Sequence, residues 1–166
     1  MTGPINTKTV ADFRTLKFTS LDDIQREAER IAAAERAGAL RRSGNWTAGQ
    51  TFGHLAAWID FAFDGYPPQI RPPWFVRALA PLAKGRFLSK PLPRGFRIPK
   101  VEGGTVATEP LTLDEGLSRL TAALDRLEQS APTHPNPVFG PLTHEQWKQA
   151  HLRHAELHLG YLHPAG

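Results

Sequence analysis

Apolar residues recur at intervals of three or four positions in four segments of the chain, and this spacing predicts amphipathic α-helices. The first predicted helix follows Ser20, has Asp23 as the second residue of a capping box, and ends at Gly38. The second predicted helix runs from about Thr47 to Asp64. In both helices the apolar positions share one face, so each helix is expected to pack that face against a core.

The other two predicted helices also begin at capping boxes. Thr112 and Glu115 open the third helix, in which leucines recur with alternating spacings of four and three residues. That alternation is typical of the contact seam of a left-handed helical bundle. Thr143 and Gln146 open the fourth helix, which is predicted to continue to Leu162.

The segment between the second and third predicted helices, residues 66–110, is unlike the rest of the chain. It contains nine prolines: Pro67, Pro68, Pro72, Pro73, Pro81, Pro91, Pro93, Pro99 and Pro110. One short helix is predicted inside it, from about Trp74 to Leu82, and no part of the chain shows a convincing pair of strands. We therefore expect a single all-α domain over residues 1–166, a four-helix bundle with a long proline-rich crossover between its second and third helices.

The composition and the absence of certain motifs exclude several kinds of functional site. The chain has no cysteine, which excludes disulfides, thiolate nucleophiles and cysteine-ligated metals and makes a reducing cytoplasm the expected compartment. Residues 1–10 lack the apolar core of a signal peptide, and no apolar stretch reaches the length of about 18 residues that spans a membrane. The motifs of nucleotide binding, serine hydrolysis and zincin chemistry are absent as well.

The net charge of +4 is unevenly distributed. No acidic residue occurs between Asp64 and Glu102, and eight basic residues lie in that stretch: Arg71, Arg77, Lys84, Arg86, Lys90, Arg94, Arg97 and Lys100. Such a stretch is most often a solvated loop, and it can also contact an anion, a nucleic acid or a membrane surface. The part with the most aromatic residues, Pro73–Arg77, is too short and too closely bounded by proline to predict a membrane-surface helix.

Three histidines share one stripe of the fourth predicted helix. His151, His154 and His158 lie within about 60° of one another, on the stripe that also carries Trp147 and Tyr161. The stripe is apolar enough to face a core, where a bundle helix usually carries leucine or isoleucine. A metal ion is the simplest explanation for three imidazoles in that position.

Helix geometry limits which of these histidines can bind the same ion. His151 with His154, and His154 with His158, are both possible chelating pairs, because residues three or four apart are neighbours on a helix. His151 and His158 are about 10.5 Å apart along the axis, too far for metal–nitrogen bonds of about 2.0–2.1 Å. One helix therefore supplies two ligands, and His54, in the middle of the second predicted helix, is the candidate for the third. Of the remaining histidines, His134 and His144 precede the fourth predicted helix or lie in its first turn, and His163 is expected in a frayed tail.

Several short motifs resemble a known family. They are Ile5-Asn6-Thr7-Lys8, Phe18-x-Ser20-Leu21-Asp22-Asp23, Asn45-Trp46-Thr47-x-Gly49-Gln50-x-x-x-His54-Leu55, Pro93-x-Gly95-Phe96-x-Ile98-Pro99, His134-Pro135-x-Pro137-x-Phe139-Gly140-x-Leu142-Thr143-x-x-x-Trp147 and His154-x-x-x-His158-Leu159. Together they cover essentially the whole chain and resemble the DUF1569 family of the DinB/YfiT-like superfamily. The resemblance implies an up-down-down-up four-helix bundle and a divalent metal ion. It also implies the ligands, one histidine from the second helix and two, spaced i,i+4, from the last: His54, His154 and His158.

Three imidazole ligands would leave at least one coordination position open, as catalytic sites do. Zinc and nickel suit imidazole best, and iron and manganese are alternatives. Each ligand is expected to donate its second ring N–H to an acceptor, for which Gln50, Asp60, Asp125 and backbone carbonyls are the candidates. His151 is then a neighbour that stands behind the ligands or faces the substrate.

Three further side chains near the histidines are interpreted from their positions. Tyr161 is a candidate hydrogen-bond donor at the mouth of a pocket, but core packing is the favoured interpretation of this side chain. Trp46 is interpreted as part of a hydrophobic staple at the start of the second helix. Glu156 lies about 200° from His154 around the helix, so it is expected to point away from the site as a solvated surface charge. No general acid or base is assigned.

The resemblance implies a metal-dependent enzyme. Members of that superfamily include thiol-dependent S-transferases and isomerases and some hydrolases, which implies a small-molecule substrate and activation of a low-molecular-weight thiol or of water. A homodimer is compatible with the sequence, whereas neither nucleic acid nor a membrane is an expected partner. Two alternatives stay open: a non-catalytic bundle that a metal or a histidine network stabilises, and an anion- or nucleic-acid-binding module that uses the basic crossover.

Overall fold

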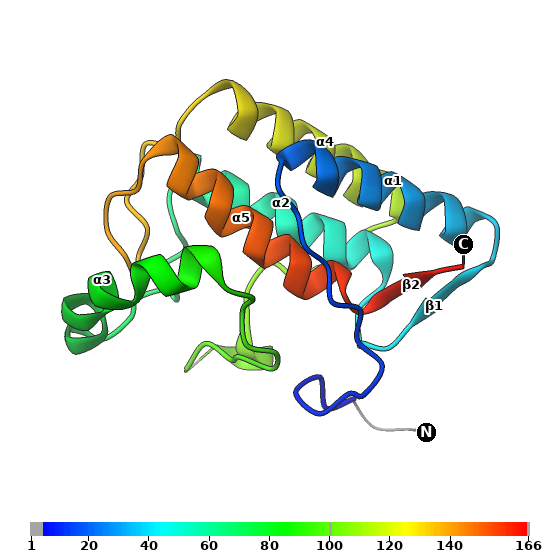
Figure 1. Ribbon diagram of the computed structural model, residues 1–166, viewed down its shortest axis with the longest axis horizontal. Helices are drawn as coiled ribbons and strands as arrows, with labels where there is room; N and C mark the ends of the chain where they lie inside the picture. Colours follow the sequence, from blue (N-terminus) through cyan, green and yellow to red (C-terminus); the bar gives the residue numbers. More distant parts are fainter. Residues whose placement is uncertain (1–4, 100, 166) are drawn as a thin grey trace.

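The computed structural model describes residues 5–99 and 101–165, and these residues are mostly helical, as the sequence pattern predicts. The helices are α1 (Leu21–Arg36), α2 (Ala48–Asp64), α3 (Trp74–Ser89), α4 (Leu113–Gln129) and α5 (His144–Leu159), with a 3-10 turn, η1, at Glu102–Gly104. Figure 1 shows α1, α2, α4 and α5 packed together and α3 beside α5 at the edge of the molecule.

Four of the helices begin where the sequence predicts, because their starting signals are local. Ser20, Thr47, Thr112 and Thr143 each cap a helix through the side-chain oxygen. In every case the side chain three residues later accepts a hydrogen bond from the backbone N–H of the capping residue, which completes the capping box. The starts of the helices that carry the histidines are therefore fixed by short-range contacts.

The prediction that the chain has no strand pair is wrong. β1 (Leu40–Arg42) and β2 (Leu162–Pro164) form a two-stranded antiparallel sheet, with Leu40 opposite Pro164. The fourth predicted helix accordingly ends at Leu159 rather than Leu162, which places Tyr161 outside the helical stripe. Three-residue strands are too short for their alternation to be recognised in a sequence. The ladder joins the segment before α2 to the segment after α5.

One apolar core lies between α1, α2, α4 and α5. Its largest fully buried side chains include Trp147, Phe52, Ile24, Ile31, Ile59, Leu120, Leu127, Leu152 and Leu159. Between α2 and the segment that enters α4 the backbones themselves meet, because a Cβ at Gly49 would lie 2.4 Å from the carbonyl oxygen of Leu111. This close approach positions the first turns of α2, from which His54 projects.

The helix predicted inside residues 66–110 exists, but its predicted end is wrong. It begins at Trp74 and continues through Pro81 to Ser89. Because proline lacks the N–H that an interior helical position donates, it often ends a helix. Here the helix continues past Pro81 for another eight residues. One side of α3 is held in place: Ala80 is buried, and the rings of Phe87 and Phe139 are 4.6 Å apart.

The segment before α1 lies against α5 (Figure 1) and is fixed there by a buried ion pair. Glu156 accepts a hydrogen bond from the backbone N–H of Phe18 (2.6 Å), and Arg153 donates one to its carbonyl (2.7 Å). The two side chains are themselves 2.8 Å apart. Burial raises the pKa of Glu156, while the Phe18 N–H and Arg153 act in the opposite direction. The expectation that Glu156 is a solvated charge is therefore wrong, because the N-terminal segment covers it.

None of the helices in the described residues is both long enough and apolar enough to cross a lipid bilayer.

Candidate metal centre

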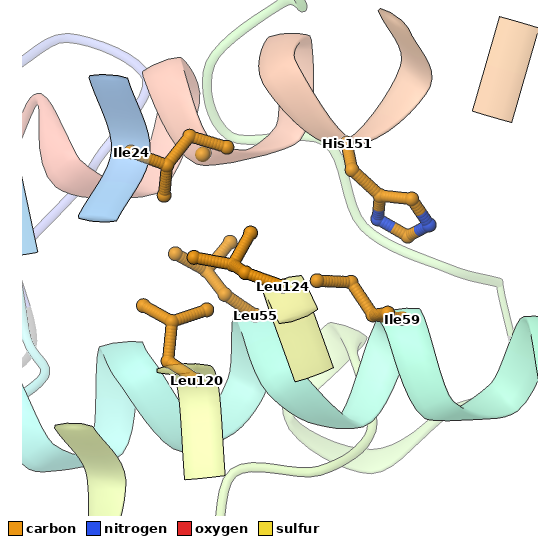
Figure 2. Close-up of a pocket in the computed structure, with 7 residues that line it drawn as sticks. Ile24, Leu55, Ile59, Leu120, Leu124 and His151 are labelled. Atoms are coloured by element: carbon orange, nitrogen blue, oxygen red, sulfur yellow. The ribbon is translucent and has the colours of Figure 1, made fainter. Parts of the chain in front are cut away.

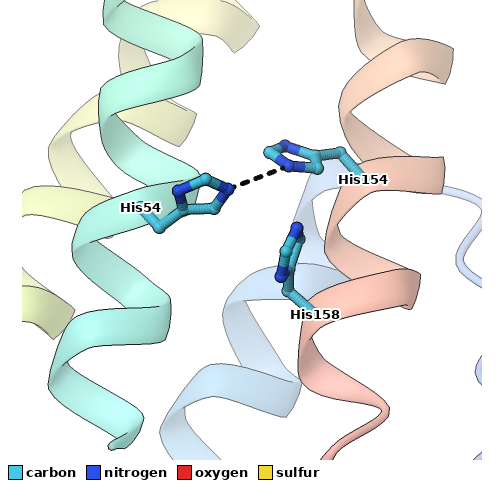
Figure 3. Close-up of side chains that lie close together, drawn as sticks. All are labelled: His54, His154 and His158. Atoms are coloured by element: carbon cyan, nitrogen blue, oxygen red, sulfur yellow. Dashed lines mark hydrogen bonds between the residues drawn. The ribbon is translucent and has the colours of Figure 1, made fainter. Parts of the chain in front are cut away.

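Three histidines from two helices meet at one point in the interior (Figure 3). His54 projects from α2, and His154 and His158 project from successive turns of α5. One ring nitrogen of each lies within 4.8 Å of the others, and the Nε2 atoms of His54 and His154 are 3.3 Å apart. The structure thus brings together the three residues that the sequence nominates as ligands.

The backbone after η1 fixes the orientation of His54. Its Nδ1 lies 3.0 Å from the carbonyl oxygen of Val106 and 3.2 Å from that of Ala107. Carbonyl oxygens only accept hydrogen bonds, so Nδ1 carries the proton and Nε2 presents its lone pair to the other histidines. Ala107 has a φ of 58°, the left-handed region that residues with a side chain rarely adopt. The turn that aims these carbonyls at His54 is therefore strained.

Gln50 supports this turn instead of contacting the histidines. Its side-chain oxygen accepts the N–H of Thr47 (3.1 Å), and its amide nitrogen donates to the carbonyl of Thr108 (3.2 Å). The two predicted aspartate acceptors do not bind the ligands: Asp60 pairs with Arg126, and Asp125 is exposed. For His54, the acceptors that the structure shows are backbone carbonyls. The sequence carries no signal for them, since every residue has a carbonyl.

Burial keeps all three imidazoles neutral at physiological pH. Desolvation lowers the pKa of His54 to about 4, although its carbonyl partners and the charge of Glu109 act in the opposite direction. The pKa of His154 is held well below its ordinary value by burial and then by the neighbouring histidines. The pKa of His158 is lowered in the same way, by burial and by His54. Neutral imidazole is the form that binds metal ions.

Two tryptophans enclose the histidines. The ring of Trp46 stacks on that of His158, with centroids 5.2 Å apart and planes 8° from parallel, and it lies 4.8 Å from the ring of His54. Trp46 is therefore a wall of the site, a role that its interpretation as a helix staple missed. Trp58 packs edge-on against His154 at 5.5 Å, and its buried indole N–H has no hydrogen-bond partner among the described residues.

His151 lies apart from the other three. Its ring stacks on Trp147, with centroids 5.9 Å apart, and burial lowers its pKa to about 4. Figure 2 shows it with the apolar side chains that line an internal cavity of about 10 Å³, the space of about one water molecule: Ile24, Leu55, Ile59, Leu120, Leu124 and Ala155. Of the two chelating pairs that helix geometry allows, the structure gathers the pair His154 and His158 with His54.

The remaining candidates are engaged elsewhere. Tyr161 donates its hydroxyl to the carbonyl of Thr7 (3.0 Å), and its ring packs on Phe13, so it anchors the N-terminal segment. The other three histidines make separate contacts, His134 with the carbonyl of Phe63, His144 with that of Leu127 and His163, in β2, with Ser43. The expectation that His163 lies in a frayed tail is wrong, because it belongs to the ladder.

The geometry of the three histidines fits a divalent metal ion. Two nitrogens bound to zinc at a tetrahedral angle, with bonds of about 2.0–2.1 Å, stand about 3.3–3.4 Å apart. The Nε2 atoms of His54 and His154 have this separation, at 3.3 Å. Among the side chains that the structure describes in residues 5–99, 101 and 103–165, no carboxylate or fourth histidine joins the group. The donor set is thus three neutral nitrogens, which is typical of sites that leave a position for a substrate.

Comparison with known proteins identifies a family but no activity. No curated protein matches the chain, and no solved structure matches it either. The family model described as "Protein of unknown function (DUF1569)" matches residues 10–165, nearly the full length. The chain therefore belongs to the DUF1569 family.

Proposed function

We propose that this protein is a metal-dependent enzyme whose divalent ion is held by His54, His154 and His158. The observation that carries the proposal is the convergence of three neutral imidazoles from α2 and α5, with ring nitrogens within 4.8 Å of one another. An imidazole that binds no cation is normally satisfied by a separate hydrogen bond to another group, as the ring of the half-buried His144 is by the carbonyl of Leu127. Here the nitrogens face one another instead.

The proposal includes a fold relationship. We infer that α1, α2, α4 and α5 form a DinB/YfiT-like four-helix bundle, with residues 66–110 as the crossover. The packing of these four helices around one core supports this inference, as does the resemblance of the motifs. In that arrangement the ligand positions are the ones that the superfamily uses.

Each residue around the centre has a role that follows from its contacts. The turn at Val106 and Ala107 holds His54 in the tautomer that presents Nε2. Trp46 fixes the plane of the His158 ring and, with Trp58, keeps bulk water away from the nitrogens. The divalent ion, zinc or nickel by ligand preference and iron or manganese as alternatives, supplies a Lewis acid that lowers the pKa of a thiol or a water molecule.

The substrate class proposed is a small molecule, with a low-molecular-weight thiol as reactant in a transferase or water in a hydrolase. This part rests on the resemblance to the superfamily. One structural feature supports a polar substrate: the buried indole N–H of Trp58 has no acceptor among the described residues, and its ring touches His154. An oxygen or sulfur atom of a bound substrate would satisfy it.

The test is the metal content of the protein purified without chelator. We expect about one ion per chain in the unaltered protein and a loss of most of it in His154→Ala. His134→Ala is the matched control, because His134 is exposed and bonds only to neighbouring groups, so this variant should keep its metal. Full metal content in His154→Ala would show that the three histidines are not the ligands.

A second candidate function, a metal site without catalysis, is favoured by one observation. His54 is only 2% exposed, and the flat stack of Trp46 on His158 closes one side of the group. Cobalt(II) loaded into the protein separates the two candidates. A visible spectrum that changes on addition of 2-mercaptoethanol indicates a position open to a thiol, whereas an unchanged spectrum favours the closed, structural site.

A further inference from the structure

Helix α3 is apolar on both of its sides, but only one side is covered. The covered side carries Ala80 and Phe87, which pack toward α5 and the loop before it. On the other side four large apolar side chains face solvent, and their exposed fractions are 80% for Trp74, 51% for Phe75, 62% for Leu79 and 86% for Leu82. A soluble domain seldom leaves four such side chains exposed together, so this face is expected to have a partner.

The four exposed side chains form a continuous stripe. At 100° per residue, Trp74, Phe75, Leu79 and Leu82 fall within an arc of about 140°, over about 12 Å of helix. Figure 1 shows α3 at the edge of the molecule, away from α1 and α4. The stripe therefore lies on a peripheral helix, on the side opposite the residues that pack toward α5.

The charge around the stripe has a single sign. Five basic residues lie on α3 or within three residues of its ends: Arg71, Arg77, Lys84, Arg86 and Lys90. No acidic residue occurs from position 65 to position 99. None of the five takes part in an ion pair within the part of the chain that the structure describes, whereas all three arginines of α1 do. Their charge is available to an anionic partner.

We propose that α3 docks on an anionic lipid surface, with Trp74, Phe75, Leu79 and Leu82 inserted at the level of the headgroups and the basic residues on lipid phosphates. Exposed aromatic and leucine side chains on one face of a helix, flanked by lysine and arginine, are the features of helices that lie in a membrane interface. The sequence expectation of no membrane partner rested on the shortness of Pro73–Arg77, and the helix is 16 residues long.

Two other occupants fit the observations less well. A second copy of the chain would pair this face with itself, and the basic residues of the two copies would then face each other across the interface. A nucleic acid needs basic side chains at the centre of the contact, where they neutralise phosphates, but the centre here is occupied by Leu79 and Leu82. An anionic bilayer can bind both parts of this surface: the apolar stripe inserts among the headgroups, and the five basic residues contact the lipid phosphates.

The first test is sedimentation of the protein with vesicles. We expect binding to phosphatidylcholine vesicles that contain phosphatidylserine, at least tenfold weaker binding to phosphatidylcholine alone, and a loss of binding at high salt. Failure to bind the anionic vesicles at low salt would overturn the proposal. So would equal binding to both vesicle types.

Paired variants then assign the binding to α3. Trp74→Ser with Leu82→Ser should weaken vesicle binding at least tenfold, and Ile5→Ser, which changes an exposed apolar residue outside α3, should not. Arg77→Gln with Arg86→Gln should weaken binding about fivefold for each charge removed. Arg42→Gln with Arg119→Gln removes the same net charge from exposed positions elsewhere and is the control. Equal effects of the α3 variants and their controls would contradict the proposal.

Fluorescence quenching tests the contact with lipid directly and needs only one conservative substitution. Lipids brominated near the headgroup should quench part of the tryptophan fluorescence of the bound protein, and Trp74→Phe should lose that part. Quenching that persists in Trp74→Phe would overturn the proposal. Light scattering provides a further check: a dimer that the Trp74→Ser and Leu82→Ser pair dissociates would assign this face to a second copy. Binding of duplex DNA that the same pair abolishes would assign it to nucleic acid.

Discussion

Gly116 on α4 lies directly against Gly49 on α2, so closely that a Cβ at position 116 would be 2.4 Å from the carbonyl oxygen of Gly49. The contact is between two backbones, which cannot rotate away as a long side chain can. It lies near the start of both helices, and His54 projects from α2 little more than one turn later. The spacing of these two helices therefore contributes to the position of His54, the first of the three proposed metal ligands.

The first prediction concerns this contact. Gly116→Ala should lower the free energy of unfolding by roughly 1–3 kcal/mol, because the added methyl group forces α2 and α4 apart. Gly85→Ala is the control, since nothing lies within 4 Å of a Cβ at that helical position. It should be neutral or stabilise the protein by up to about 1 kcal/mol. Urea denaturation of both variants measures the difference, and equal stabilities would contradict the close approach.

A second prediction concerns the strained turn that orients His54. Ala107→Gly should raise the free energy of unfolding by about 0.5–1 kcal/mol, because relief of the left-handed backbone outweighs the added flexibility of the unfolded chain. Ala33→Gly, at an exposed position inside α1, should instead lower it by about 1 kcal/mol. If both substitutions destabilise the protein equally, the backbone at position 107 is not strained.

The pH dependence of stability gives a third prediction. Burial lowers the pKa of His151 to about 4 from its ordinary value of 6.5, so the unfolded chain takes up a proton between these values that the folded chain does not. The contribution of His151 is thus fully present above pH 6.5 and is lost as the pH falls toward 4. Between about pH 7.5 and pH 5, the unaltered chain should lose about 2 kcal/mol more stability than His151→Phe. Denaturation curves recorded with a chelator measure this difference, and parallel pH profiles would rule out a buried neutral imidazole.

The ion pair beneath the N-terminal segment provides a fourth prediction. Arg153→Met should cost roughly 3–5 kcal/mol, because it leaves the buried carboxylate of Glu156 without its cation. The double variant Arg153→Met with Glu156→Gln should be more stable than Arg153→Met alone, since the amide still accepts the N–H of Phe18. Arg36→Met, which breaks an exposed pair with Asp114, should cost less than about 1 kcal/mol. Strict additivity of the two buried substitutions in a double-mutant cycle would refute the coupling.

The sequence predicts best what depends on neighbours along the chain. Ser20, Thr112 and Thr143 could be identified as helix starts because a capping box involves four consecutive residues. The shared face of His154 and His158 follows from helical spacing, and the structure places their ring centroids 4.7 Å apart. Both are short-range properties that need no knowledge of the fold.

Contacts between distant segments could not be predicted. The turn that binds His54 is built from backbone carbonyls, and the strained residue within it is an alanine, where glycine or asparagine would have been the signal. Glu156 has the angle of a surface residue on its own helix, yet the segment that ends at Phe18 covers that surface. In both cases the sequence does not reveal which distant segment of the chain packs against which helix.

The ladder between β1 and β2 has a consequence for how the protein is made. It pairs Leu40 with Pro164, two positions far apart in the sequence, and it closes beside the last turn of the helix that carries His158. Contacts between such distant positions form late, because the entropy cost of closing a long loop comes before the free energy gained from the contacts. His54 and His158 are likewise distant in the chain, so on the ribosome the proposed metal site stays incomplete until α5 has emerged and packed against α2.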